Sequence, residues 1–86
     1  MFSYISFLNK SSHPAVAVFL DEAEAEALLL AHKKSPLHIT DAGSHSVIIA
    51  DRFFNTIFDL YIPLYPNTKN TLIIEDNKAY LSRHAP

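Results

Sequence analysis

The side chains in this sequence that could do acid–base or metal chemistry are its five histidines and the aspartates near them. His38 and His45 flank the stretch Asp41-Ala42-Gly43-Ser44, whose composition is typical of a turn. In a hairpin built on this turn, strands 37–40 and 45–50 would pair, and the two imidazoles would become diagonal neighbours on one face. Zinc normally takes three or four ligands, and Asp41 supplies only a third. We therefore predict no metal site and expect His38 and His45 to be two half-exposed strand histidines. A pH-sensitive surface is the alternative.

General acid–base catalysis would require a histidine to meet a carboxylate such as Asp41, Asp51 or Asp59. Such a pairing requires tertiary geometry that the sequence does not provide, and Ser11-Ser12-His13 before Pro14 indicates a solvated turn. The chain has one glycine and no cysteine. These counts exclude glycine-rich phosphate loops, dinucleotide fingerprints, nucleophile elbows, disulfides and thiol chemistry. We predict a protein that is not an enzyme and binds no cofactor, with a small His/Asp-dependent enzyme as an alternative.

The composition indicates one folded domain over residues 1–86, because 49% of the residues are hydrophobic and 19% are charged. Seven basic residues against nine acidic ones give a net charge of −2, and the longest basic run is Lys33-Lys34. Nucleic-acid binding requires a basic footprint, so it is not expected. The N-terminus lacks a secretory signal, and charged residues interrupt the longest apolar stretch. We therefore expect a cytoplasmic protein without a membrane segment.

The stretch Val47–Leu64 holds much of the large apolar content. We predict a strand over Val47–Ala50, an amphipathic helix over Asp51–Tyr61 and an exit at Pro63–Pro66. At about 100° per residue, one arc of that helix collects large side chains. These predicted core anchors are Phe53, Phe54, Ile57, Phe58 and Tyr61. The alternative is a strand over Thr56–Leu64, in which Phe58, Leu60, Ile62 and Leu64 alternate.

A second helix is predicted over Asp21–Lys34. Asp21 would be its N-cap, with Glu24 three residues later as in a capping box. Acidic residues then lie in the first turns and basic ones in the last, which suits the helix dipole, and Pro36 ends the helix. On this wheel Leu29 falls among charged residues, so we expect it to be exposed.

The remaining segments indicate strands. Phe2–Leu8 and Ala15–Leu20 are predicted to form an antiparallel hairpin, with the first strand at an edge of the sheet and the second covered on both faces. The segment 71–83 is predicted to form a hairpin with Asp76-Asn77 as its turn, pairing Ile73 with Tyr80. Residues 84–86 are expected to be a frayed tail.

The predicted fold class is α+β, with element order β-β-α-β-β-α-β-β. A single antiparallel sheet of five or six strands would pack with two helices. No stretch of the sequence matches a motif specific enough to name a family.

The predicted function is a non-enzymatic interaction module, a regulator, inhibitor or adaptor that binds another protein or acts as a homodimer. The surplus of apolar residues motivates this hypothesis. Its candidate contact residues are Leu29, Ile73, Tyr80, Phe2 and Tyr4.

The alternative is a winged-helix-like DNA-binding protein, with helix 50–61 for recognition and hairpin 71–83 as the wing. That helix would offer only Arg52 against Asp51 and Asp59, which argues against phosphate contacts.

Overall fold

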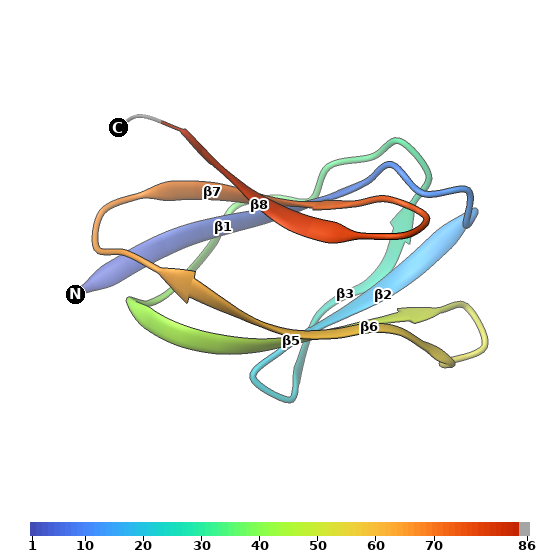
Figure 1. The fold of residues 1–86 in the computed structure, drawn as a ribbon, viewed down its shortest axis with the longest axis horizontal. Helices are drawn as coiled ribbons and strands as arrows, with labels where there is room; N and C mark the ends of the chain where they lie inside the picture. The colour runs from blue at the N-terminus through green and yellow to red at the C-terminus, as the bar shows by residue number, and fades with distance from the viewer. Residues whose placement is uncertain (85–86) are drawn as a thin grey trace.

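Two four-stranded β-sheets pack face to face in the computed structural model, which describes residues 1–84 (Figure 1). Sheet A has the strand order β4 (His38–Asp41), β1 (Phe2–Asn9), β7 (Lys69–Ile74) and β8 (Ala79–His84). Sheet B has the order β3 (Ala23–Leu30), β2 (Ala15–Leu20), β5 (Gly43–Asp51) and β6 (Thr56–Leu64). The described residues contain no helix, so the predicted α+β class with two helices is wrong and the protein is an all-β sandwich.

The chain crosses between the sheets at the links β1–β2, β3–β4, β4–β5 and β6–β7. Strand β1 therefore pairs with β4 and, in parallel, with β7 rather than with β2. The predicted hairpins 2–8/15–20 and 37–40/45–50 are wrong, although strands form in all four segments. Strand β1 also lies inside its sheet instead of at the edge. The prediction that Ala15–Leu20 is a central strand is confirmed, because β2 lies between β3 and β5.

Asn9 explains why β1 does not fold back onto β2. Its fully buried side chain donates through Nδ2 to the carbonyl oxygens of His13 (3.3 Å) and Leu29 (3.1 Å). Its Oδ1 accepts from the backbone N–H of Ser11 (3.0 Å) and from the Ser11 hydroxyl (2.6 Å). These bonds fix the corner at which the chain leaves sheet A and enters sheet B.

The helix predicted over 21–34 is wrong, because this segment forms the β2–β3 turn and strand β3. Asp21 and Glu22 have φ angles of 52° and 69°, so Asp21 lies in a tight turn and not at a helix N-cap. Ala23–Leu30 pairs with β2 in a register with two irregularities, and it places Leu29 in the core with 4% of its surface exposed. Strand pairing with β2 overrides the helix propensity of alanine, glutamate and leucine.

The helix predicted over Asp51–Tyr61 is also wrong, and the alternative strand over Thr56–Leu64 is confirmed as β6. Within it, Ile62 and Leu64 are buried and Phe58 and Leu60 pack against the core. Of the predicted helix anchors, Phe53, Phe54 and Tyr61 are 69%, 70% and 77% exposed.

The hairpin predicted for 71–83 is confirmed, with Ile73 opposite Tyr80 and Leu72 opposite Leu81. The backbone N–H of Glu75 donates to the carbonyl of Lys78 across the turn (2.8 Å). The tail predicted at 84–86 falls mostly outside the described residues, since only His84 is described and it ends β8.

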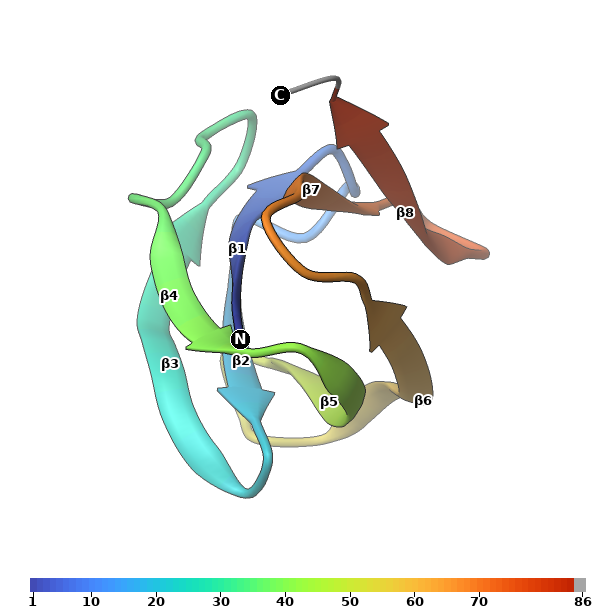
Figure 2. The ribbon, with the colours of Figure 1, turned by 90° about the vertical axis from the view of Figure 1, so that its left-hand side faces the viewer.

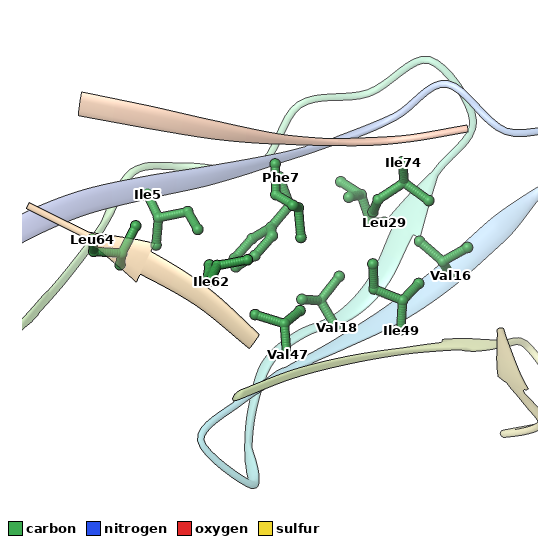
Figure 3. Close-up of a cluster of buried hydrophobic side chains, with 11 residues drawn as sticks. Ile5, Phe7, Val16, Val18, Leu29, Val47, Ile49, Ile62, Leu64 and Ile74 are labelled. Atoms are coloured by element: carbon green, nitrogen blue, oxygen red, sulfur yellow. The ribbon is translucent and has the colours of Figure 1, made fainter. Parts of the chain in front are cut away.

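The core is the space between the two sheets. Figure 3 shows Ile5, Phe7 and Ile74 pointing from sheet A toward Val18, Val47 and Ile49 of sheet B. Full burial of a side chain of this size stabilises the fold by about 1.5–3 kcal/mol.

Figure 2 shows the two sides of the sandwich, where β4 lies near β3 and β8 lies near β6, and a polar contact links the sheets on each side. On one side, Nε2 of His38 in β4 lies 2.8 Å from Oε2 of Glu26 in β3. On the other, Arg83 of β8 donates to the carbonyl oxygen of Pro63 in β6 (3.0 Å).

Candidate binding surface

The outer face of sheet B, the lower face in Figure 1, carries an apolar hollow. The hollow has a volume of about 320 Å³ and is lined by Phe19, Glu22, Ile48, Ala50, Phe54 and Thr56. Phe19 on β2 is opposite Ile48 on β5, and both point away from the core because their neighbours Val18 and Ile49 point into it. Ala50 carries only a methyl group, so its side chain leaves the space of the hollow unfilled. The volume lies at the lower end of ligand sites, which is about 300 Å³.

The loop between β5 and β6 places two exposed phenylalanines beside this hollow. Oδ1 of Asp51 accepts from the backbone N–H groups of Phe53 (2.8 Å) and Asn55 (2.9 Å). Phe54 has a φ of 63°, which is uncommon for a residue with a bulky side chain. Its backbone N–H donates to the carbonyl of Asp51 (2.9 Å), so the turn is held from both ends. Phe54 is therefore presented to solvent by a defined backbone rather than by a loose loop.

The turn lowers the pKa of the Asp51 carboxyl. The backbone N–H of Asn55 lowers the pKa of the Asp51 carboxyl most strongly, followed among the favourable contacts by that of Phe53. The guanidinium of Arg52 lies 4.9 Å from the centre of the Phe53 ring and stacks over it. The loop thus carries two exposed aromatic rings on a turn that the hydrogen bonds of Asp51 hold in place.

Other apolar side chains extend the same face. Tyr61 of β6, opposite Ser46, points outward and is 77% exposed. Leu30 of β3 is opposite Ala15 and is 49% exposed. Large contiguous apolar patches are uncommon on monomeric proteins and mark surfaces that contact another molecule.

Four of the five contact residues predicted from the sequence lie on the outer face of the other sheet, in two separate groups. Phe2 and Tyr4 lie toward one end of sheet A, and Ile73 and Tyr80 form a cross-strand pair toward the other. Oε2 of Glu75 accepts from the Tyr80 hydroxyl (3.3 Å).

A buried polar pair separates these two groups of contact residues. The Ser6 and Thr71 hydroxyls lie 3.2 Å apart in the middle of the sheet, and both residues are buried. This face therefore has two small apolar patches instead of one. The fifth predicted residue, Leu29, is in the core and belongs to neither outer face.

The two histidines considered as ligands belong to different sheets, because His38 lies in β4 and His45 in β5. Nδ1 of His45 lies 2.5 Å from Oδ2 of Asp21, and its Nε2 lies 2.5 Å from the carbonyl oxygen of Asp41. His38 instead contacts Glu26. Across residues 1–84, no three His, Cys, Asp or Glu side chains are grouped as metal ligands.

No protein-family model matches the chain, and no curated protein matches it significantly. In the part of the chain that the structure describes, no helix is long and apolar enough to cross a membrane. The fold and surface define the class of the molecule as a small all-β sandwich with one hollowed, aromatic-rich sheet face.

Sequence reasoning missed Phe19, Ile48 and Phe54 as surface residues. It assigned Phe54 to a helix core and Phe19 to a fully covered strand. One signal was available for Phe54, because Phe53-Phe54 stands between Asp51-Arg52 and Asn55. An aromatic pair inside a polar turn is typical of an exposed loop.

Proposed function

We propose that this protein is a non-enzymatic protein-binding module and that its partner binds the outer face of sheet B. The observation that carries this proposal is the apolar hollow bordered by Phe54, which is 70% exposed. Aromatic side chains held in a fixed geometry are the usual anchors of protein interfaces. Here the Asp51 turn orders Phe53 and Phe54 before binding, which lowers the entropy cost of association.

The arrangement of the histidines also favours binding over catalysis. His45, which has the closest carboxylate partner, uses both ring nitrogens in hydrogen bonds to Asp21 and Asp41. A general base needs a free ring nitrogen within reach of a substrate proton. The DNA-binding alternative required a recognition helix, and residues 1–84 contain none.

Site-specific photo-crosslinking tests the proposal, and the absence of native cysteine makes it straightforward. A benzophenone on Thr56→Cys would lie at the hollow, whereas one on Lys69→Cys would lie on the outer face of sheet A. In lysate of the native host, we expect one dominant protein adduct from the first position, reduced by excess unlabelled protein, and none from the second. Equal labelling from both positions, or no adduct from Thr56→Cys, would contradict the proposal. An adduct with a second copy of this chain would show that the protein forms a homodimer through this face.

A further inference from the structure

One row of side chains crosses the outer face of sheet B from edge to edge. Glu24 of β3 is opposite Phe19 of β2, Phe19 is opposite Ile48 of β5, and Ile48 is opposite Asp59 of β6. Residues opposite each other in neighbouring strands share a face of the sheet. The apolar pair in the hollow is therefore bracketed by a carboxylate on each side.

These carboxylates have no partner within residues 1–84. Glu24 and Asp59 are exposed and make no hydrogen bond or ion pair there, and the same is true of Glu22 at the rim. The charge is also one-sided over the whole sheet. Glu24 and Asp59 share this face with Phe19 and Ile48, and none of the four strands of sheet B contains Lys or Arg. An apolar hollow between unpaired negative groups is complementary to an apolar side chain between positive ones.

The spacing of the row limits the backbone that could present such groups. Glu24 and Asp59 are separated by three strand spacings of about 4.8 Å, or about 14 Å. In an extended peptide, side chains i and i+4 point the same way and lie about 13 Å apart, with i+2 midway. On a helix, residues i and i+4 are only about 6 Å apart, so a helix would need the longer spacing i, i+4 and i+8 to present the same three groups.

We infer that the partner segment is an extended peptide with the pattern basic–x–apolar–x–basic, lying across the strands of sheet B. Its apolar side chain fills the hollow against Phe19, Ile48 and Phe54, and its two basic residues pair with Glu24 and Asp59. This inference rests on the proposed protein-binding function and specifies the chemistry of the partner.

A second copy of this chain does not supply that segment. Its seven Lys and Arg residues are Lys10, Lys33, Lys34, Arg52, Lys69, Lys78 and Arg83, and no two of them are four positions apart. The occupant is therefore a different protein.

A matched set of capped synthetic peptides tests the pattern by two-dimensional NMR titration at low salt, about 25 mM, where exposed charges are least screened. The probe carries Lys-Ser-Phe-Ser-Lys between glycines. One control replaces both lysines by glutamate, the second replaces phenylalanine by serine, and the third deletes both serines to shorten the spacing. We expect the probe to bind with Kd below about 1 mM and to shift the amides of Phe19, Ile48 and Phe54, with each control at least about tenfold weaker.

Protein variants provide the reciprocal test. Glu24→Gln combined with Asp59→Asn should weaken the probe about fivefold, because two exposed ion pairs each contribute modestly. Glu75→Gln, on the other sheet, should leave binding unchanged. Three results would overturn the inference. The lysine and glutamate peptides bind equally well, the double variant binds the probe as tightly as the native protein, or the probe does not bind at all. If the Thr56→Cys adduct still forms in that case, the protein-binding function stands and only the peptide pattern fails.

Discussion

His45 and Asp21 form a 2.5 Å contact between Nδ1 and Oδ2 that joins the beginning of β5 to the β2–β3 turn. The other ring nitrogen of His45 faces the carbonyl oxygen of Asp41, also at 2.5 Å. A carbonyl and an ionised carboxylate can only accept, so this geometry favours the charged form of His45, in which both ring nitrogens carry hydrogen. The backbone N–H of Ser46 donates to the second oxygen of Asp21 (3.0 Å). One charged histidine thus connects the β2–β3 turn, β4 and β5.

The two groups shift each other's pKa in opposite directions. Burial, the largest influence on each, lowers the pKa of His45 and raises that of Asp21. The hydrogen bonds outweigh it, so the pKa of His45 is raised and that of Asp21 is lowered relative to their ordinary values.

The first prediction concerns the free energy of unfolding as a function of pH. A raised His45 pKa contributes stability fully below about pH 6.5, the unfolded value, and this is lost as pH rises through the folded pKa. The lowered Asp21 pKa contributes above about pH 3.8 and is lost as pH falls through its folded value. The contribution of the pair is therefore greatest between these limits. Urea denaturation across the pH range measures it.

The control for that prediction is His45→Asn, which keeps a donor near Asp21 but cannot become charged. Near pH 5.5 we expect this variant to be less stable than the native protein by about 1–2 kcal/mol. The difference should shrink as the solution becomes alkaline. A difference that stays constant from about pH 5 to pH 9 would contradict the assignment of a charged His45.

The second prediction compares two adjacent leucines in β3. Leu29 is 4% exposed and Leu28 is 64% exposed. Leu29→Ala should cost about 2–5 kcal/mol of unfolding free energy because it leaves a cavity in the core. Leu28→Ala should stay within about 0.5 kcal/mol. Chemical denaturation of both variants measures the contrast. A larger loss of stability in Leu28→Ala than in Leu29→Ala would contradict the burial of Leu29.

The third prediction concerns Gly43, where the chain leaves β4 and enters sheet B. Its φ of 135° is disfavoured for residues with a Cβ atom, although a Cβ there would meet no heavy atom within 4 Å. Gly43→Ala should therefore destabilise the protein by about 1–3 kcal/mol through backbone strain alone. D-alanine introduced by chemical ligation is the matched control, because it accepts positive φ. If L- and D-alanine give the same melting temperature, strain is not the cause.

The fourth prediction concerns the loop that presents Phe53 and Phe54. Asp51→Ala removes the acceptor for the N–H groups of Phe53 and Asn55. The amide order parameters of residues 52–55 should fall from about 0.85 toward 0.6, as measured by ¹⁵N relaxation. Asp59→Ala, which removes an exposed carboxylate without hydrogen bonds, is the control. Unchanged order parameters in Asp51→Ala would show that the loop does not depend on this carboxylate.

The sequence predicted most strands, but not which strands pair. The hairpin at 71–83 was predictable in full register because turn, charge and alternation are all local to it. The corner at Asn9 was not predictable, because the Asn9 side chain donates a hydrogen bond to the carbonyl of Leu29, twenty residues away in the chain. Ala23–Leu30 was mistaken for a helix because its residues have high helix propensity, while its strand conformation depends on pairing with β2.

The candidate surface was even less accessible to sequence reasoning. Glu24, Phe19, Ile48 and Asp59 come from four strands, and only strand order and register place them in one row. The general expectation of apolar surface could be drawn from composition, but its location could not. Phe2, Tyr4, Ile73 and Tyr80 lie on the outer face of sheet A instead.

The most direct test of the central claim compares the two outer faces for binding of the partner found by crosslinking. Phe54→Ser alters the outer face of sheet B, and Tyr80→Ser alters that of sheet A. Biolayer interferometry should give at least about tenfold weaker affinity for Phe54→Ser, as expected for an aromatic anchor, and a change below about twofold for Tyr80→Ser. Weakening by Tyr80→Ser with full affinity of Phe54→Ser would place the interface on sheet A and contradict the proposal.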